Sequence, residues 1–338
     1  MKSPQFFCAD LAQWFGSHGK SYPWRETQDP YAILVSEVML QQTQIPTVLE
    51  RGFYTRWMER FPTVQTLAAA REEDVLKAWE GLGYYRRARN LQKLAQVVMA
   101  EHGGHLPRNV AGLLSLPGIG PYTAGAVASF AYDVSAPIVD GNVARVLSRI
   151  FNDPTPIDST AGLKKLWDRA GALVVGAESP RIYNAALMEL GQTHCRPGVP
   201  SCQSCPVRSY CTTEDPAALP VKGKKVELTD VTERVFYLET AKGIWLQHET
   251  GSRRTGMWRF PELAETATLP PVIYKGTYGI TRYRVVLWVH QALPSMAEII
   301  ENSAGRWVPH HELDSLTMPS PYRRALEAIM KDRSFTLR

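Results

Sequence analysis

Long apolar runs and strongly one-sided charge are both absent from this sequence. No stretch of about 18 uncharged apolar residues occurs, so no transmembrane helix is predicted. The N-terminal segment Met1–Phe7 also lacks the apolar core of a secretory signal, and we therefore expect a cytoplasmic protein with no membrane partner. The net charge is only +5, from 38 basic and 33 acidic residues. This mild balance permits a nucleic-acid partner but does not require one.

Cysteine is scarce, yet four of the five cysteines lie within seventeen residues. Cys195, Cys202, Cys205 and Cys211 have the spacing C-x6-C-x2-C-x5-C. Disulfides are disfavoured, because a chain without a secretory signal is expected in a reducing compartment. Four thiolates in one loop suit an iron–sulfur cluster or a structural zinc ion. Only Cys202 and Cys205 form the short knuckle that zinc sites usually carry twice, which favours a cluster and leaves zinc as the alternative.

The pattern of apolar residues changes near residue 214 and divides the chain into two parts. Before it, apolar residues recur with helical spacing, for example in Tyr31–Leu40, Val48–Phe61, Thr123–Ala131 and Val143–Ile150. Beyond it, strands are predicted at Arg234–Glu239, Ile244–His248, Tyr283–His290 and Arg306–Val308, with a closing helix at Pro321–Asp332. We predict a helical region over 1–213, a linker rich in proline and lysine over 214–231, and a smaller α/β domain over 232–338.

A glycine turn between two helical segments is a candidate phosphate site. The run Leu116-Pro-Gly-Ile-Gly120 precedes Pro121, which suits the first turn of a helix. Gly118 and Gly120 lack a Cβ atom, so the backbone can turn sharply and expose its N–H groups to an anion. Such a turn would hold a duplex backbone without sequence preference. A plain helix–turn–helix corner is the alternative.

Two carboxylates occupy contrasting environments. Glu37 lies on a helix among Ile33, Leu34 and Leu40, and this apolar surface should raise its pKa and favour the protonated acid. Asp140 precedes the next periodic helix as its N-cap, where the helix dipole favours the ionised form. One protonated and one charged carboxyl group is the arrangement that cleaves glycosidic bonds. Asp140 as a simple cap and Glu37 as a core residue are the alternatives.

Taken together, these motifs resemble the helix-hairpin-helix base-excision DNA glycosylases that carry an iron–sulfur cluster. Three runs, Ser36–Gln44, Gly81–Leu91 and Val139–Val143, are similar to the MutY-type adenine glycosylases within that group. The resemblance covers about the first 215 residues. It implies an all-α helix-hairpin-helix glycosylase fold, with a six-helix barrel over about 24–132 and a cluster domain over about 1–23 and 133–213. It also implies one 4Fe–4S cluster, held by the four cysteines.

The resemblance assigns a role to each candidate site residue. The implied reaction is hydrolytic removal of adenine mispaired with 8-oxoguanine or guanine, after the base has left the stack. Glu37 matches the general acid, Asp140 the carboxylate that stabilises the sugar cation, and Tyr122 and Asn142 residues that support them. The remaining matches are Trp24, Arg25 and Glu189 in the adenine pocket, Gln42 and Tyr84 as wedges beside the lesion, and Gly118 and Gly120 on the DNA backbone.

Two positions imply a monofunctional enzyme. Relatives that also nick the strand carry a lysine in the hairpin, where this chain has Pro121, Tyr122 and Thr123. A second lysine that is common in the family, after the Asp-Gly-Asn-Val run, is Ala144 here. No amine is therefore expected at either position to form a Schiff base.

The C-terminal α/β domain resembles the NUDIX-like lesion-recognition domain of the same family. The similarity lies in Arg253–Glu262, which contains the pattern G-x-W-x-F-P, and no acidic Nudix box accompanies it. Relatives carry an aromatic-Ser-His loop that probes 8-oxoguanine, whereas this chain reads Thr277–Arg284 without a Ser-His pair. Tyr278, Thr281 and Arg282 are the candidates to replace it.

Three functions stay open on the sequence alone. The first is an adenine glycosylase acting as a monomer on mismatched double-stranded DNA, associated with a bacterial nucleoid. The second is a related glycosylase for thymine or uracil opposite guanine. The third is a non-catalytic, cluster-bearing DNA-binding protein, which would need neither Glu37 nor Asp140.

Overall fold

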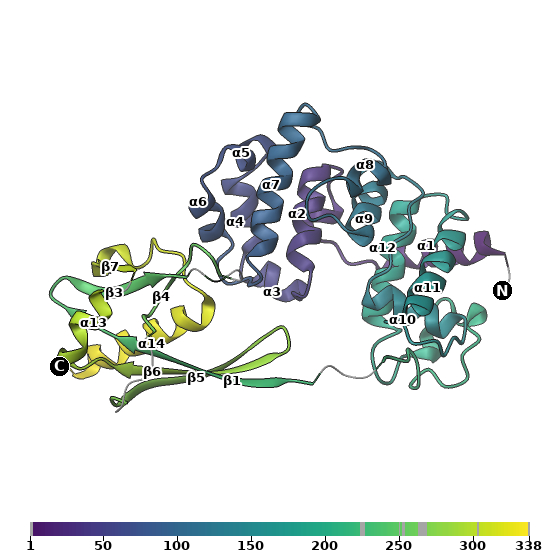
Figure 1. Cartoon of the computed structure of the whole chain (residues 1–338). Coiled ribbons are helices and arrows are strands. Elements are labelled where there is room, and N and C mark those ends of the chain that lie inside the picture. Colours follow the sequence, from purple (N-terminus) through teal and green to yellow (C-terminus); the bar gives the residue numbers. More distant parts are fainter. Residues whose placement is uncertain are drawn as a thin grey trace. The chain divides into compact units, whose positions relative to one another are not determined.

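Contacts within the chain divide it into two compact units. The computed structural model describes residues 3–223, 227–249, 251, 254–262, 269–302 and 304–336. One unit comprises Met1–Ala69 and Asn90–Lys225, and the other comprises Ala70–Arg89 and Val226–Arg338 (Figure 1). The sequence predicted a helical region followed by a strand-rich one. It did not predict that residues 70–89 group with the C-terminal part of the chain.

The first unit, which we call the helical unit, is built from helices and short turns. Its α-helices are α1 Pro4–His18, α2 Pro30–Leu40, α3 Ile45–Glu50, α4 Phe53–Arg60, α5 Val64–Ala69, α8 Val110–Leu114, α9 Pro121–Tyr132, α10 Gly141–Ile150, α11 Thr160–Val174 and α12 Pro180–Thr193. Helix α7, Arg86–Glu101, starts in the other unit and continues into this one. Three 3-10 turns complete it, η1 Pro23–Arg25, η2 Cys202–Ser204 and η3 Arg208–Tyr210. The segment predicted as one helix over Val48–Phe61 is split into α3 and α4 at Gly52, whose φ is +61°.

Side-chain caps define where several of these helices begin. Asp29 accepts a hydrogen bond from the backbone N–H of Tyr31 and is followed by Pro30, the first residue of α2. Asn109, Ser159 and Ser179 cap α8, α11 and α12 in the same way. None of the helices in the described ranges is both long enough and apolar enough to cross a bilayer.

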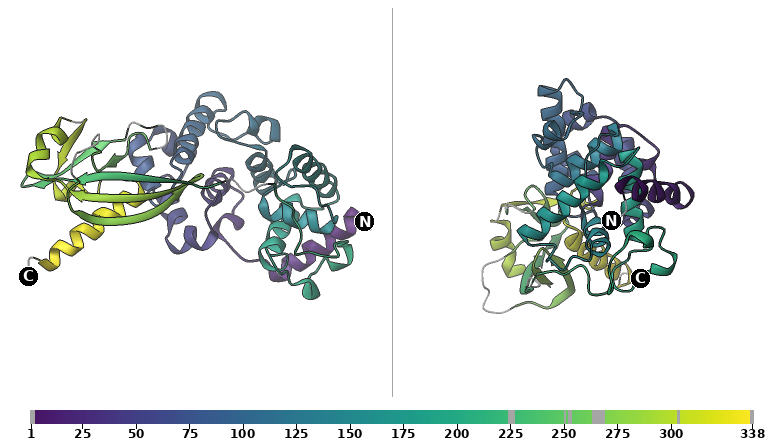
Figure 2. Two further views of the ribbon diagram at one scale, coloured as in Figure 1. Left: turned by 60° about the horizontal axis from the view of Figure 1, so that its bottom comes forward. Right: turned by 90° about the vertical axis from the view of Figure 1, so that its right-hand side faces the viewer.

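Helices α2, α9, α10 and α12 form the centre of the helical unit. Helix α2 packs on α9, and α12 packs on α1, α9 and α10 (Figures 1 and 2). Every residue of α2 from Tyr31 to Met39 is buried. A Cβ atom at Gly125 of α9 would lie 2.2 Å from the carbonyl oxygen of Pro137, so only glycine allows this close approach. The approach places the segment before Asp140 directly against α9.

The described residues of the second unit include two small sheets, a short helix and the start of α7 from residues 70–89, and a long C-terminal helix. Helix α6 is Glu72–Ala78, and the first sheet has the order β1–β6–β5, with β1 Thr229–Tyr237, β5 Val272–Ile280 and β6 Tyr283–Gln291. Strands β1 and β6 are parallel, and β5 and β6 form an antiparallel hairpin. The second sheet pairs β3 Gly243–His248 with β2 Glu239–Thr240, β4 Trp258–Arg259 and β7 Gly305–Val308. The remaining elements are η4 Pro294–Met296, α13 Ala297–Glu301, η5 His310–Glu312 and α14 Ser320–Thr336.

Helix α14 covers one face of the first sheet (Figure 2). Tyr322, Leu326 and Ile329 of α14 join a buried core with Leu287 and Val289 of β6. The closing helix and strands β3, β6 and β7 were predicted close to their observed bounds, whereas β1 begins five residues before its predicted start at Arg234. The short strands β2 and β4 and the long strand β5 were missed. The glycines of β5 at 276 and 279 weaken the strand pattern, and pairing with β6 along its length overrides that local preference.

The predicted linker over 214–231 is only partly a linker. Leu219 is buried, and its carbonyl oxygen accepts a hydrogen bond from Arg149 Nε at 3.0 Å. Val221 and Gly223 bond to Ile157 and Asp158 of the helical unit. At the other end, strand β1 already begins at Thr229.

Candidate active site

Glu37 is a buried carboxylic acid on the most deeply buried helix of the helical unit. Only 5% of its surface is exposed, and Ile33 and Leu34 of the same helix are fully buried. The pKa of Glu37 is raised from 4.5 to about 7, mainly by burial and in smaller part by the nearby charge of Asp140. The hydrogen bond from Tyr122 and the charge of Arg25 act in the opposite direction. The predicted protonated acid is therefore supported by the surroundings of this side chain.

Tyr122 joins α9 to α2 through the carboxyl group of Glu37. Its hydroxyl donates to Glu37 Oε2 at 2.7 Å and lies 3.9 Å from Met188 Sδ of α12. Burial raises the pKa of Tyr122 well above 10, and the charges of Glu37 and Asp140 raise it further. Tyr122 therefore stays protonated and acts as a fixed donor to Glu37.

Asp140 is the N-cap of α10, as predicted. Its Oδ1 accepts from the backbone N–H of Val143 at 2.7 Å, and its Oδ2 accepts from Asn142 Nδ2 at 3.0 Å. Burial raises the pKa of Asp140 above 3.8, whereas these hydrogen bonds and the charge of Arg145 lower it. The cap was expected only to favour the charged form, and burial is the opposing effect that the sequence did not reveal. These hydrogen bonds and the charge of Arg145 favour the ionised form of Asp140, and its negative charge raises the pKa of Glu37.

A cavity of about 490 Å³ opens beside Glu37. Trp24, Arg25, Met188 and Lys20 are among the residues that line it. The ring of Trp24 is buried between Tyr22 and Tyr54, with centroids 5.4 and 5.3 Å away. A larger hollow of about 980 Å³ elsewhere in the helical unit contains none of the predicted site residues. The smaller cavity is therefore the candidate site, because it combines concave shape with the perturbed acid.

Arg25 lines this cavity and forms an ion pair with the buried Glu189, which is not itself one of the lining residues. Arg25 Nη1 lies 2.9 Å from Glu189 Oε2, and Glu189 is completely buried. The second oxygen, Glu189 Oε1, is also buried and has no hydrogen-bond partner among the described residues. A buried carboxylate oxygen without a partner is costly in a folded protein, so a ligand that donates a hydrogen bond would stabilise it.

Two buried arginines that the sequence analysis missed connect Asp140 to the cysteine loop. Arg145 donates to Asn142 Oδ1 at 2.9 Å and to the carbonyl oxygen of Cys195 at 2.7 Å. Arg149, one turn later on α10, donates to the carbonyl oxygen of Arg196 at 2.8 Å and lies 3.4 Å from Cys195 Sγ. Arginines at i and i+4 within the apolar positions of one helix were the signal available in the sequence.

The four predicted cysteine ligands lie around one small cavity. Cys195, Cys202, Cys205 and Cys211 all line it, and none of them is in a disulfide. Across the described ranges, no group of three or more His, Cys, Asp or Glu side chains is arranged to hold a single metal ion. Burial raises the pKa of Cys205 to about 11, so nearby positive charge or a bound metal is needed to keep its thiolate.

The helix-hairpin-helix turn has the conformation expected of a backbone anion site. Gly118 has a φ of +77°, and a Cβ atom there would lie 2.8 Å from Asn90 Cβ. Gly120 is the N-cap of α9, with no side-chain cap and no atom near the position of a Cβ. The first backbone N–H groups of α9 are therefore left for another acceptor.

Both predicted wedge residues have left-handed backbone conformations. Gln42, in the turn after α2, has a φ of +59° and is exposed. Tyr84, in the second unit, has a φ of +49° and is 47% exposed. Non-glycine residues rarely adopt this conformation, and it often marks functional positions.

The candidate lesion-reading residues of the C-terminal part lie at the β5–β6 hairpin. The Tyr278 hydroxyl is bonded to Arg254 and Glu233, so it is held against the covered face of the sheet. Thr281 and Arg282 are exposed at the tip, and Thr281 has a φ of +52°. Arg253, at the start of the G-x-W-x-F-P segment, lies outside the described residues.

The raised pKa of Glu37 predicts a pH-dependent effect of Glu37→Gln on stability. The folded state holds the Glu37 proton up to pH about 7, whereas the unfolded state loses it near 4.5, so this stabilisation is present below 4.5 and is lost as pH rises to 7. Glutamine has no proton to lose. We expect Glu37→Gln to gain about 3 kcal/mol of unfolding free energy relative to the unaltered protein between pH 4.5 and pH 8.

Urea unfolding of both proteins at the two pH values measures this gain. Exposed Glu59→Gln on α4 is the matched control and should show no such gain. An equal effect of the two substitutions at both pH values would show that Glu37 is not held protonated.

Comparison with known proteins places this geometry in a family. Residues 35–169 match the HhH-GPD superfamily of base excision DNA repair proteins. The chain is 48% identical over 217 residues to the adenine DNA glycosylase of Rattus norvegicus, covering 61% of this chain and 41% of that protein. It is 43% identical over 203 residues to the adenine DNA glycosylase of Mycolicibacterium smegmatis, covering 60% of this chain and 67% of that protein.

A solved structure of a DNA glycosylase named for another base has a similar fold over the matched part. A thermostable thymine-DNA glycosylase superposes with a TM-score of 0.56 at 30% identity, covering 62% of this chain and 95% of that one. The matched part spans about two fifths of the length of the rat relative and two thirds of the mycobacterial one. The chain belongs to the adenine DNA glycosylase family, within the HhH-GPD superfamily of base excision DNA repair proteins.

Proposed function

We propose that this chain is a glycosylase that hydrolyses the N-glycosidic bond of adenine in duplex DNA, where adenine is mispaired with 8-oxoguanine or guanine. The observation that carries the proposal is the buried acid Glu37, with a pKa of about 7 and a hydrogen bond from Tyr122. Such an acid donates a proton near neutral pH, which the departing base requires. The identity to adenine DNA glycosylases supports adenine as that base.

The proposed roles follow from the two carboxyl groups. Glu37 protonates the flipped adenine at N7, so that the base leaves as a neutral molecule while the sugar develops positive charge. Asp140, whose ionised form is favoured by its hydrogen bonds and by Arg145, is proposed to supply the negative charge that stabilises the sugar cation. Glu37, having lost its proton, then accepts one from the attacking water. Asn142 and Tyr122 hold the two carboxyl groups in position through hydrogen bonds of 3.0 and 2.7 Å.

Recognition of adenine is proposed for the cavity beside Glu37. The buried Glu189 Oε1, which has no partner in the described parts of the chain, is proposed to accept from the exocyclic amino group of adenine. Arg25 neutralises Glu189 through the 2.9 Å ion pair, and Trp24 offers an aromatic surface near the base. Thymine lacks an exocyclic amino group, so the unpartnered oxygen favours adenine over the thymine alternative.

The proposed enzyme is monofunctional, because the hairpin and position 144 lack the lysines that would form a Schiff base. Lys20 also carries an amine and lines the cavity. The monofunctional proposal therefore rests on the hairpin and position 144 alone, where family members carry the lysines. We further propose duplex DNA as the partner, bound by a monomer through Gly118 and Gly120, with Gln42 and Tyr84 as wedges. A NUDIX-like role for the second unit in reading the base opposite adenine is proposed through Thr281 and Arg282, since the Tyr278 hydroxyl is already engaged.

The cysteine loop is proposed to hold one 4Fe–4S cluster. Four free thiols line a common cavity, and their sequence has only one short C-x2-C knuckle where zinc sites usually carry two, which favours a cluster over zinc. Arg149, beside Cys195 Sγ, supplies positive charge that would favour a thiolate ligand. When bound, the cluster would cross-link the loop through four iron–thiolate bonds. Arg145 and Arg149 would then transmit that rigidity to α10, which Asp140 caps.

Single-turnover base release from defined duplexes tests the proposed function. Adenine should be released from duplexes with adenine opposite 8-oxoguanine or guanine, and not from those with adenine opposite thymine. Glu37→Gln should lower the rate at least about 1,000-fold, because the proton donor is lost, while duplex affinity stays within about threefold. Release of thymine or uracil opposite guanine would support the related-glycosylase alternative. Binding without any base release would support the non-catalytic one.

Iron analysis and the visible absorption spectrum test the cluster. The purified protein should contain about four iron atoms per chain, and Cys202→Ser should lose iron and lower the thermal unfolding midpoint. Cys8→Ser is the matched control, because Cys8 lies outside the loop and should leave iron content unchanged. Stoichiometric zinc with no iron would contradict the cluster assignment.

A further inference from the structure

The loop that carries Tyr84 has a strained and exposed backbone. Three of its residues have left-handed φ values, +101° at Gly81, +71° at Gly83 and +49° at Tyr84. Glycine tolerates these values, but a tyrosine does so only where its neighbours hold it. With 47% of its surface exposed, Tyr84 receives little support from burial of its own side chain. The support must therefore come from the residues around the loop.

Part of that support lies next to the loop in sequence. Trp79 Nε1 donates to the carbonyl oxygen of Gly83 at 3.0 Å, and Arg87 Nη2 donates to the same oxygen at 3.2 Å. The guanidinium of Arg87 also lies 5.6 Å from the centre of the Tyr84 ring. These contacts shape the loop, but they do not anchor it to a larger body.

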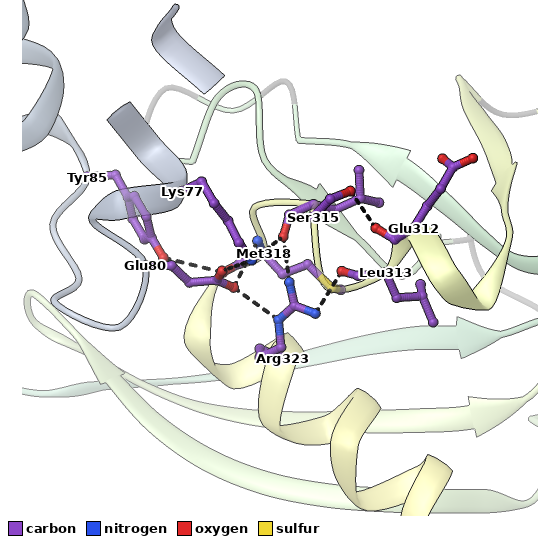
Figure 3. A network of polar contacts seen from close by, with 9 residues as sticks. Lys77, Glu80, Tyr85, Glu312, Leu313, Ser315, Met318 and Arg323 are labelled. Atoms are coloured by element: carbon purple, nitrogen blue, oxygen red, sulfur yellow. Dashed lines mark hydrogen bonds and ion pairs between the residues drawn. The ribbon is translucent and has the colours of Figure 1, made fainter. Parts of the chain in front are cut away.

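The anchor is Met318, which binds the residues on both sides of the loop. Its backbone N–H donates to Glu80 Oε1 at 3.3 Å, and its carbonyl oxygen accepts from the Tyr85 hydroxyl at 3.3 Å (Figure 3). Glu80 immediately precedes Gly81, and Tyr85 immediately follows Tyr84. Met318 itself is completely buried in the core beneath α14. The loop is thus held at both ends by one residue, 234 positions beyond Tyr84 in the sequence.

Arg323 of α14 also bonds to Glu80, and we call Glu80, Tyr85, Met318 and Arg323 together the clamp. Its Nε donates to Glu80 Oε1 at 3.0 Å, and its two terminal nitrogens donate to the carbonyl oxygens of Leu313 and Leu316 at 3.0 and 2.5 Å (Figure 3). Lys77 Nζ reaches Glu80 Oε2 at 2.5 Å and the carbonyl oxygen of Leu316 at 3.1 Å. The side chains of Arg323 and Glu80 are only 14% and 16% exposed, so water screens their ion pair weakly. All of these residues belong to the second unit.

We propose that Glu80 and Arg323 are positioning residues for Tyr84. Through them, the C-terminal part of the chain determines where Tyr84 stands when the protein meets DNA. The proposal rests on the proposed function, in which Tyr84 is inserted beside the mispair. The C-terminal part of the chain would then position Tyr84, in addition to its proposed contact with the base opposite adenine.

Arg323→Gln tests the clamp, because glutamine keeps hydrogen-bonding capacity but removes the charge beside Glu80. Hydrogen exchange is followed at the amides of Leu82 and Arg87, which bond to the carbonyl oxygens of Trp79 and Tyr84. We expect exchange there to become at least about tenfold faster in the variant. Arg324→Gln, an exposed change on the same helix, is the matched control and should leave exchange unchanged. Tyr85→Phe releases the other end of the loop without a change in charge, and should also speed exchange.

The effect of the clamp on Tyr84 insertion is measured with a duplex that carries 2-aminopurine beside the mispaired base. Its fluorescence increases when the stack is opened, and Arg323→Gln should reduce that increase and lower the single-turnover rate by about tenfold or more, with duplex affinity nearly unchanged. Arg323→Lys, which keeps a cation beside Glu80, should recover most of both signals. A purely structural role of Arg323 would lower stability without this rescue of the fluorescence.

The two measurements separate the possible failures. Exchange needs no substrate, so unchanged exchange in Arg323→Gln overturns the clamp whatever the activity. Faster exchange with an unchanged rate and unchanged fluorescence overturns its role in positioning Tyr84. Faster exchange in Arg323→Gln, together with no base release from any mispair by the unaltered protein, would support the clamp and contradict the proposed function.

Discussion

The proposed proton transfer from Glu37 depends on one hydrogen bond within the helical unit, from the Tyr122 hydroxyl to the Glu37 carboxyl group. Helix α2 is buried along nearly its whole length, so a carboxyl group on it is stable mainly in its protonated form. Tyr122 and Arg25 offset part of that effect, which leaves the pKa of Glu37 near neutrality rather than far above it. The close packing of α9 at Gly125 places both the hydroxyl and the segment leading to Asp140 within reach.

The second carboxylate connects this acid to the rest of the helical unit. Asp140 bonds to Asn142, Asn142 to Arg145, and Arg145 to the backbone of Cys195. A continuous chain of hydrogen bonds therefore runs from the proposed reacting sugar to the proposed cluster loop. A similar arrangement occurs in the second unit, where the buried backbone of Met318 bonds to Glu80 and Tyr85 on either side of the exposed Tyr84 loop. In both cases a buried core positions a few side chains to which we assign a role toward the proposed substrate.

Much of this could be predicted from the sequence, for identifiable reasons. Helical periodicity, caps such as Asp29 and the proline and glycine signals located most helices, and apolar neighbours on one helix face indicated the buried acid Glu37. What the sequence did not reveal depends on tertiary contacts. Strand β5 exists through its pairing with β6, and Arg145 and Arg149 gain their roles from a distant loop. Residues 70–89 group with a segment that begins only at Val226. Likewise, the burial that raises the pKa of Asp140 comes from its tertiary surroundings.

The pH dependence of single-turnover adenine release tests the central claim most directly. If Glu37 is the proton donor, the rate should be highest below pH 7 and should fall about tenfold per pH unit above the pKa of about 7. Tyr122→Phe removes the hydrogen bond that lowers this pKa, so the midpoint of the fall should move to higher pH. A rate that does not change between pH 6 and pH 8.5, or a midpoint that moves to lower pH in Tyr122→Phe, would contradict the account.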